Sequence, residues 1–313
     1  MRVFLAGSTG AIGQRLLPHL INGGHEVVAL VRSPEKGKHV EALGVKAAVA
    51  DALDKDGLTA AVRSAEPEVV IHELTALAGV RDFKRLDDEF ALTNRFRTEV
   101  TDTLLAAARL VGARRFIAQS FCGWPFAREG GPVKNEGDPL DPSPPPNFRK
   151  TLAAIRYLED TVKRTGDLQA LALRYGIFYG PGTSISRDGP IVELVRARKL
   201  PIVGSGAGIW SFVHVKDAAS ATAAAVSRGA PGIYNVVDDE PAPVSLWLPA
   251  LAEAVGAKPP HRMPAWLGKL AIGEGGVAMM TSIRGGSNAK AKRELGWQPT
   301  YPTWRRGFVE GLG

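Results

Sequence analysis

Residues 5–16 read LAGSTGAIGQRL and connect a short apolar run, Val3–Ala6, to a segment with helical character, Ala11–Asn22. Glycines recur at every third position between the two. In dinucleotide-binding proteins the first such glycine permits a tight turn, the second lets the backbone approach a pyrophosphate, and the third lets the helix pack on the strand. The helix N-terminus then offers free N–H groups to the phosphates. A plain glycine-rich turn is the alternative. The stretch predicts a phosphate-binding loop made of Gly7, Thr9, Gly10, Ala11, Ile12 and Gly13.

Outward from this loop, apolar runs and helical segments alternate. Further strands are expected at Val27–Val31, Val45–Ala50, Val69–His72, Phe116–Gln119 and Leu168–Arg174, and the longest helical pattern runs from about Asp87 to Leu110. This alternation is typical of βαβ units around a parallel sheet with both faces covered. We therefore expect an α/β, doubly wound parallel-sheet Rossmann fold in residues 1–180 plus 209–238. We expect residues 181–208 with 239–313 to form a smaller, mainly C-terminal substrate domain.

Composition narrows the class of protein. The chain has 313 residues, of which 45% are hydrophobic and 23% charged, which is ordinary for a globular protein with a large core. A single cysteine, Cys122, excludes an internal disulfide and fits a reducing compartment. No apolar run approaches the roughly 20 residues needed to span a bilayer, so we expect a cytoplasmic protein without a membrane partner. The net charge of +7 is not gathered into basic blocks, so we expect no nucleic-acid partner.

The end of the second predicted strand bears on the choice of cofactor. NAD-binding sheets usually carry an acid there for the ribose 2′-hydroxyl, whereas this chain has Arg32 and Ser33, with Lys36 and Lys38 nearby. A guanidinium binds a 2′-phosphate that an acid would repel. This favours NADP, with NAD as the alternative if Arg32 only points into solvent. Asp51, followed by Ala52, ends the third strand and is placed to accept from the adenine amino group, or is simply an acid at a strand end.

With these features in hand, the chain resembles the extended and atypical short-chain dehydrogenase/reductases, and within them the NAD(P)-dependent epimerase/dehydratase group. The resemblance runs from Arg2 to about Phe308. Its most specific parts are GSTGAIG, LTNRFRTEVTDTLLAAARLVGARRFIAQS, LRYGIFYGPGT, SFVHVKDAA and AKRELGWQP.

The resemblance implies roles for further residues. Ser120 matches the residue that hydrogen-bonds the substrate oxygen, although it could be an ordinary polar residue at a strand end. Asn94 matches an asparagine that braces the site. Backbone at Leu74, Thr75 and Ala76 would pass the nicotinamide ribose, and the segment Tyr175, Gly176 and Ile177 would lie along the carboxamide.

The chain departs from the family at its acid–base pair. A Tyr-x-x-x-Lys motif is expected near positions 147 and 151, which hold Asn147 and Thr151. Shifting the register by one residue either way does not restore both groups. In the family the tyrosine exchanges the proton, and the lysine lowers its pKa and holds the nicotinamide ribose. Here the proton would come from Lys150, from water held by Asn147 or Asn94, or from a hydroxyl of the substrate.

The substrate side looks aromatic. Trp210 stands where sugar-nucleotide members of the family often carry an arginine, and an indole suits a ring better than a diphosphate. Trp124, Phe126 and Tyr179 are expected nearby, unless these aromatic residues only form core. His214 lies in an apolar run and is interpreted as a hydrogen-bonded core histidine. Six scattered histidines and one cysteine give no metal-ligand spacing.

Together these features predict an NADP-dependent oxidoreductase or epimerase-like enzyme. It would act on a carbonyl or secondary alcohol of a small or sugar-like molecule. The alternative is a regulatory protein that binds NADP(H) without turnover. A homodimer is also expected, since family members often pair through the helices predicted near 87–110 and 148–165. The apolar residues on those helices are Phe90, Leu104, Leu105, Leu152, Ile155 and Leu158.

Overall fold

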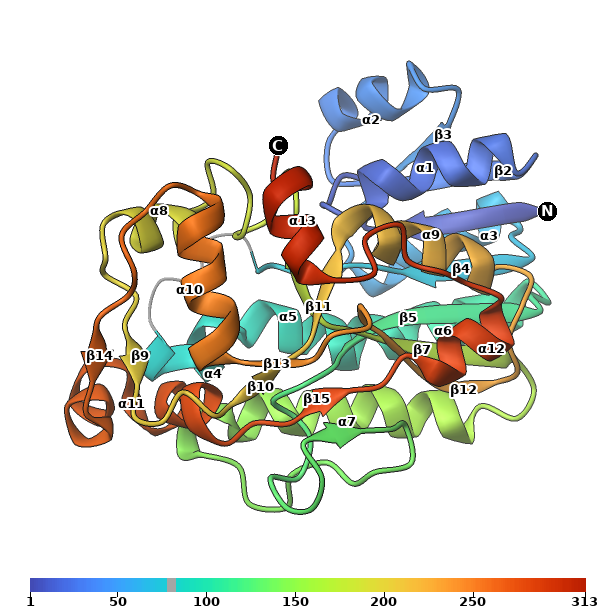
Figure 1. Ribbon diagram of the computed structural model, residues 1–313. Helices are drawn as coiled ribbons and strands as arrows, with labels where there is room; N and C mark the ends of the chain where they lie inside the picture. The colour runs from blue at the N-terminus through green and yellow to red at the C-terminus, as the bar shows by residue number, and fades with distance from the viewer. Residues whose placement is uncertain (78–82) are drawn as a thin grey trace.

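The structure, a computed structural model, describes residues 1–77 and 83–313. Its centre is a parallel sheet of seven strands in the order β12-β7-β5-β4-β1-β2-β3 (Figure 1). The strands are β1 (Arg2–Ala6), β2 (Glu26–Val31), β3 (Lys46–Val49), β4 (Val69–His72), β5 (Arg115–Phe121), β7 (Gln169–Tyr175) and β12 (Gly232–Val236). The strand order reverses between β1 and β4, which is where a doubly wound sheet binds its ligand. The predicted fold class is confirmed.

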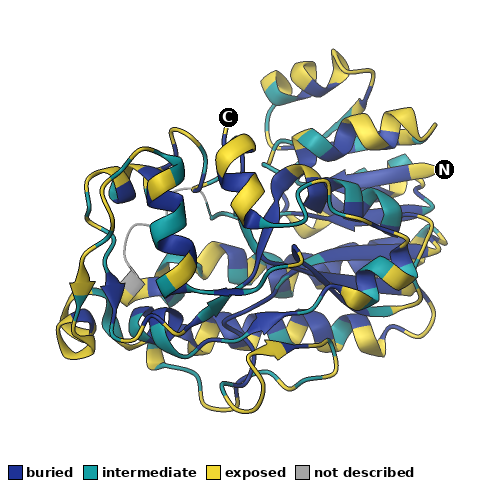
Figure 2. Cartoon of the chain, viewed as in Figure 1, coloured by how far each residue is buried: buried dark blue, intermediate teal, exposed yellow. Residues whose placement is uncertain are grey.

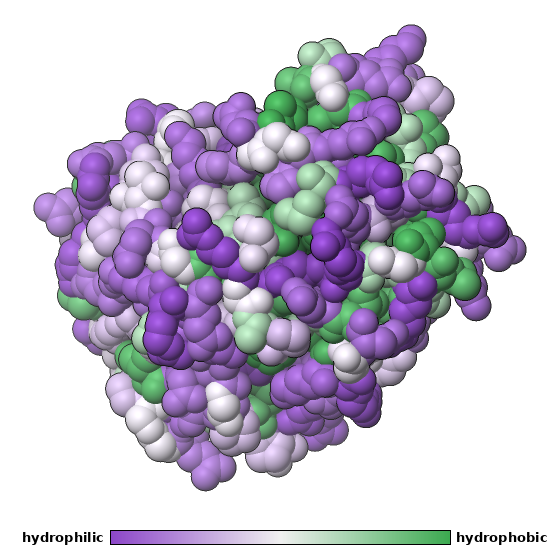
Figure 3. Space-filling model, turned by 90° about the vertical axis from the view of Figure 1, so that its right-hand side faces the viewer, coloured by the Kyte–Doolittle hydropathy of each residue, from purple (hydrophilic) through white to green (hydrophobic). Residues whose placement is uncertain are grey.

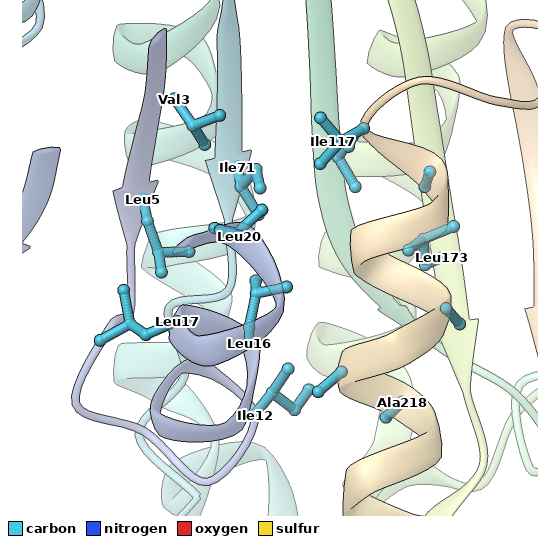
Figure 4. Close-up of a cluster of buried hydrophobic side chains, with 14 of the residues drawn as sticks. Val3, Leu5, Ile12, Leu16, Leu17, Leu20, Ile71, Ile117, Leu173 and Ala218 are labelled. Atoms are coloured by element: carbon cyan, nitrogen blue, oxygen red, sulfur yellow. The ribbon is translucent and has the colours of Figure 1, made fainter. Parts of the chain in front are cut away.

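Helices cover both faces of this sheet because its strands are apolar on both sides. Leu16, Leu17 and Leu20 of α1 (Gly13–Asn22) pack on alternate residues of β1 and β4, beside α9 (Val215–Ala225) (Figure 4). The opposite face packs against α3 (Lys55–Ala65), α6 (Thr101–Leu110) and α7 (Arg149–Arg164). Figure 2 shows the sheet as the most continuously buried part of the chain. The carboxyl ends of the strands are therefore the part of the sheet that remains open to a ligand.

A second core lies beside these ends. It is formed largely by α8 (Pro190–Arg196), α10 (Val244–Ala254) and α13 (Trp304–Glu310), with Trp247, Trp304 and Phe308 almost fully buried. Four short strand pairs lie outside the seven-stranded sheet: β8 (Ile177–Tyr179) with β11 (Phe212–His214), β9 (Ile202–Val203) with β14 (Arg262–Met263), β10 (Ile209–Trp210) with β13 (Ala242–Pro243), and β6 (Val133–Lys134) with β15 (Gly285–Gly286). α11 (Ala265–Thr281) bends at Gly273, whose φ is +74°.

The long helix expected from Asp87 to Leu110 is interrupted. It consists of α4 (Leu86–Glu89), α5 (Ala91–Arg95), a π-helical turn η2 (Phe96–Val100) and α6. The Phe96 carbonyl accepts from His72 Nε2 at 3.0 Å and from Thr101 Oγ1 at 3.2 Å. Because these side chains compete for a helix carbonyl, the helix widens at this turn. Such π turns often lie at functional sites.

The apolar residues expected at a dimer interface are used inside the chain. Leu104, Leu105, Leu152, Ile155 and Leu158 are at most 2% exposed. They pack on the sheet or in the cluster beside it, so they offer no surface to a second copy. Figure 3 shows one side of the molecule as mainly hydrophilic with separate apolar patches. A homodimer therefore stays a prediction. No described helix has the length and apolar character needed to cross a membrane.

Candidate active site

The phosphate-binding loop has the geometry that its glycines predict. Gly7 has a φ of +104°, and a Cβ atom at that position would lie 2.6 Å from the Glu73 backbone. A Cβ at Gly13 would lie 2.2 Å from the Gly7 carbonyl oxygen. Thr9, Gly10 and Ala11 remain at least partly exposed ahead of α1, while Ile12 is buried in the core. The loop therefore offers bare backbone at a helix N-terminus, which suits a pyrophosphate.

The residues expected around the adenosine half lie at the ends of β2 and β3. Arg32 directly follows β2, is exposed, and takes part in no hydrogen bond or ion pair with another described residue. Ser33 begins α2 (Pro34–Glu41), where its side chain accepts from the Lys36 N–H. Asp51 is exposed and its Oδ1 accepts from the Leu53 N–H at 2.9 Å, while Ala52 is buried. The Arg32 guanidinium is thus available for a 2′-phosphate.

The segments expected around the nicotinamide half lie at the ends of β4 and β7. Leu74, Thr75 and Ala76 are partly exposed, and the Ala76 N–H donates to Thr93 Oγ1 of α5 at 2.9 Å. Gly176 passes so close to β11 that a Cβ there would lie 2.6 Å from the Ser211 carbonyl oxygen. Ile177 is partly exposed. The backbone of these segments is placed at the same edge of the sheet as the glycine loop.

Tyr175 has a role that the sequence did not indicate. Its side chain is buried, and its hydroxyl lies 2.8 Å from Glu73 Oε1 and 2.6 Å from Thr222 Oγ1. Thr222 in turn donates to the Ala218 carbonyl at 2.8 Å. These three contacts need three protons, and the two hydroxyls supply only two. A protonated Glu73 supplies the third, so the chain runs from Glu73 through Tyr175 and Thr222 to Ala218. Burial raises the pKa of Glu73 from 4.5 to about 8, which agrees with this count.

Glu73 is expected to make stability depend on pH. The folded protein holds this proton between pH 4.5 and about 8, whereas the unfolded chain does not. The stabilising contribution is therefore complete below pH 4.5 and is lost as pH rises to about 8. The loss is at most about 1.4 kcal/mol per pH unit. Glu73→Gln, which keeps a donor for Tyr175, should remove this slope in urea denaturation at pH 5, 7 and 8.5. Glu41→Gln, on the exposed face of α2, is the control; equal slopes in Glu73→Gln and wild type would contradict the prediction.

Helix α7 carries no tyrosine–lysine pair at this edge. Tyr157, its one tyrosine, is 39% exposed on the outer side, where its hydroxyl donates to Asp102 at 2.6 Å. Asp87 caps the first turn by accepting from the backbone N–H of Lys150 at 2.9 Å and from Thr151 at 2.8 Å. The Lys150 side chain is exposed. Its role as proton donor stays a prediction.

Ser120 lies deeper than its predicted role requires. It is 1% exposed, and its Oγ donates to Glu159 Oε1 at 2.7 Å. Glu159 also receives two hydrogen bonds from Arg174, at 2.7 and 2.6 Å, in a fully buried ion pair. Contact with a substrate would require Ser120 to leave Glu159. The structure therefore supports a structural role for this hydroxyl more directly than a catalytic one.

An apolar cluster, which we call the aromatic cluster, lies where the proton-transfer groups were expected. Phe121 directly follows Ser120. The ring centroids of Phe121 and Trp124 are 6.1 Å apart, and those of Trp124 and Phe148 are 4.6 Å apart. Leu152 and Ile155 of α7 complete it, with Trp210 packed at its border. Phe121 and Trp210 are partly exposed. This end of α7 therefore presents hydrocarbon to the site.

The remaining predicted substrate residues divide between this cluster and the core. Trp124 belongs to the cluster, and Asn147, which immediately precedes Phe148, is partly exposed. Trp210 donates to the Met279 carbonyl at 2.8 Å and packs 4.8 Å from Trp247. Tyr179 is fully buried among Phe212, His214 and Phe308. Its side chain thus has a packing role, which corrects the expected position beside the substrate.

Several other residues have structural roles. Phe126, which was expected near the substrate, is buried, and the Arg174 guanidinium lies 5.1 Å from its ring centroid. The interpretation of His214 is confirmed, because it is buried and its Nε2 lies 3.0 Å from the Gly311 carbonyl. Asp217, in the first turn of α9, accepts from the Thr300 N–H at 2.7 Å. Within residues 1–77 and 83–313 no group of His, Cys, Asp and Glu side chains is placed to hold a metal ion.

Asn94 joins two sides of the site. Its amide donates to Thr151 Oγ1 at 3.2 Å, and its Oδ1 accepts from Arg97 at 3.3 Å. Sequence reasoning placed Asn94 here but missed Arg97 and Glu73. Glu73 is a charged residue directly after the fully buried strand β4, whereas Arg97 lies among exposed and partly exposed residues. The contrast between an apolar strand and the acid that ends it is a signal that could have found Glu73; the sequence holds no such signal for Arg97.

The glycine loop at the switch point of a doubly wound sheet, with the nicotinamide-side segments beside it, defines a dinucleotide-binding enzyme of the short-chain dehydrogenase/reductase type. The sequence pattern of the NAD dependent epimerase/dehydratase family matches residues 3–236. The chain belongs to this family, and it is an NAD(P)-dependent oxidoreductase or epimerase-like enzyme.

Known proteins of this kind are similar along the whole chain. A 3-diazoavenalumate denitrifying reductase from a Streptomyces species is 45% identical over 309 residues, covering 98% of this chain and 99% of that protein. The UDP-glucose 4-epimerase of Thermus thermophilus, solved with NAD, has 25% identity and a TM-score of 0.73, covering 100% and 98% of the two chains. A human epimerase family protein solved with NADPH has 19% identity and a TM-score of 0.77, covering 100% of this chain and 99% of that one. These similarities support a nicotinamide cofactor and favour an enzyme over a non-catalytic sensor.

Proposed function

We propose that this chain is an NADPH-dependent reductase that replaces a diazonium group on an aromatic ring by hydrogen. The observation that carries the proposal is the aromatic cluster at the end of α7, where the tyrosine–lysine pair is absent. Reduction of a carbonyl needs a proton for the oxygen, and loss of a general acid typically costs about 10²–10⁴ in rate. Its 45% identical relative is named for acting on a diazo compound with loss of nitrogen.

The proposed reaction balances without a proton from the protein. When bound, NADPH would supply the hydride for the new C–H bond, and the C–N bond would break with its electron pair leaving on dinitrogen. The overall change is arenediazonium plus hydride to arene plus dinitrogen. The task of the chain is then to bind the ring, hold it against the cofactor and exclude water. It needs no acid matched to the working pH, which explains why Asn147 and Thr151 can occupy the expected motif positions.

The aromatic cluster is suited to that task. Phe121 and Trp210 are partly exposed; Phe121 packs against Trp124, and Trp210 packs against Trp247. Aromatic faces attract cations by roughly 0.5–2 kcal/mol, so they favour a positively charged diazonium over a neutral ring. Leu152 and Ile155 keep this side of the site apolar, which lowers the access of water that would trap a diazonium.

The preference for NADPH is part of the same proposal. Arg32 is exposed beyond β2 without a described partner, and Ser33 lies next to it at the start of α2. An arginine here provides a permanent positive charge for a 2′-phosphate. The exposed Asp51 is the candidate partner of the adenine amino group.

The test uses a carboxylated arenediazonium salt and NADPH deuterated at C4, prepared as both C4 epimers. We expect one deuterium on the ring carbon that carried nitrogen, from one epimer only, with one dinitrogen released per NADPH oxidised. A reaction in deuterated water should put no solvent deuterium there. Gly13→Val, in which a side chain would collide with Gly7, is the control for uncatalysed reduction. Turnover of an aryl ketone but not of the diazonium would instead assign carbonyl reduction.

A further inference from the structure

Arg97 is a buried cation without a counterion among residues 1–77 and 83–313. Its side chain is 5% exposed. Within the described residues its single hydrogen bond joins Nη1 to Asn94 Oδ1 at 3.3 Å, and no carboxylate lies within 4.0 Å. Burial lowers the pKa of its guanidinium to about 10, with the charge of Glu159 acting in the opposite direction. An arginine has five N–H donors, so most of them are left for something other than the protein.

The nearest acid does not serve as its partner. Glu159 already accepts two hydrogen bonds from Arg174 and one from Ser120. The charges of that buried pair compensate each other, so Arg97 remains an additional positive charge. Keeping the N–H donors of such a group out of water is costly unless they find hydrogen-bond acceptors. The arrangement therefore points to a ligand atom that the protein chain does not supply.

The position of Arg97 indicates which ligand atom this is. Arg97 lies in the π turn η2, and helical side chains lean toward the helix N-terminus. Its guanidinium accordingly contacts Asn94, one turn earlier, which also donates to Thr151 at the start of α7. The neighbouring Thr93 accepts from the N–H of Ala76 in the loop after β4. Arg97 thus belongs to the side of the site that the β4 loop and α7 share.

We propose that Arg97 binds the hydroxyls of the nicotinamide ribose and so positions the nicotinamide for hydride transfer. Arg97, in η2, takes the place of the motif lysine that is absent from α7. Asn94, which is itself held by Thr151, fixes the orientation of its guanidinium. The proposal rests on the nicotinamide-dependent reductase described above, but not on the identity of the molecule that is reduced. The aromatic cluster, on the substrate side, consists of hydrophobic residues and contains no positively charged side chain.

The test compares two probes that share the adenosine half. NADPH contains the nicotinamide ribose, and adenosine 2′,5′-bisphosphate does not. Arg97→Met should weaken NADPH binding about tenfold or more, since hydrogen bonds to charged groups are lost. Binding of adenosine 2′,5′-bisphosphate should stay within about twofold of wild type. Arg109→Met is the matched control. It removes an exposed arginine of α6 that pairs with Asp167, and it should leave both affinities unchanged.

Melting without ligand separates binding from a structural role. Because Arg97→Met removes an uncompensated buried charge, the ligand-free variant should melt no lower than wild type. A lower melting temperature in both Arg97→Met and Arg97→Gln, or an equal loss of affinity for both probes, would overturn the proposal. So would unchanged NADPH affinity with a raised KM for the diazonium, which would assign Arg97 to the substrate. Failure of diazonium turnover alone leaves the two-probe comparison intact and concerns only the proposed function.

Discussion

Arg32→Asp is expected to abolish the preference for NADPH that we propose for this enzyme. A hydrogen bond to a charged group contributes about 1.5–3 kcal/mol, so loss of the guanidinium alone should weaken NADPH binding roughly 10- to 150-fold. The aspartate should weaken it further, because a carboxylate would face the 2′-phosphate. The same carboxylate can accept from the hydroxyls of the NAD ribose, so NADH affinity should hold or improve. Titration of both reduced cofactors into wild type and variant measures the effect.

The position of Arg32 makes this result specific. It is exposed at the end of β2 and without a described partner, so the substitution should not disturb the fold. Arg63→Asp, on the exposed side of α3, changes the net charge equally and serves as the control. Equal wild-type affinities for the two cofactors, or parallel losses in the variant, would show that Arg32 does not select NADPH.

Glu159→Ala is expected to have the largest effect on stability. The substitution leaves the Arg174 guanidinium, whose side chain is 2% exposed, without its ion-pair partner. It also removes the acceptor for Ser120 Oγ. Breaking a buried pair from one side typically costs about 3–5 kcal/mol. Equilibrium unfolding in urea should show this loss.

A double variant separates the pair from simple loss of packing. Glu159→Ala with Arg174→Met removes both charges and should be more stable than Glu159→Ala alone, because no uncompensated cation remains. Ser120→Ala should cost far less, about 1 kcal/mol. A double variant less stable than Glu159→Ala would mean that the ion pair itself is not the main contribution.

The cofactor half of the site was predictable because its signals are local. Gly7, Gly10 and Gly13 lie within seven residues, between a strand and a helix, and the structure gives Gly7 the positive φ that only glycine adopts easily. Arg32 follows the next strand. Neither inference required knowledge of how distant segments meet. The alternation of apolar strands and helices fixed the sheet for the same reason.

The reacting half depended on contacts between distant segments. Ser120 was assigned to the substrate oxygen by family resemblance, and nothing nearby in the sequence shows its buried contact with Glu159, 39 residues away. Glu73 is 102 residues from Tyr175, whose hydroxyl it meets. Tyr179 was expected beside the substrate, since nothing nearby in the sequence shows that α13 covers it with Phe308. In each case the residue type was suggestive, and tertiary packing decided its role.

The order of the strands gives this enzyme a modular character. The loop, Arg32 and Asp51 follow β1, β2 and β3, which form one side of the sheet. The aromatic cluster, Asn94 and Arg97 come from segments that begin only after β4. The surfaces that recognise the adenine end and those that direct the chemistry therefore share little backbone. In a fold with this strand order, acid–base residues can therefore be replaced by apolar side chains while the nucleotide-binding residues are retained.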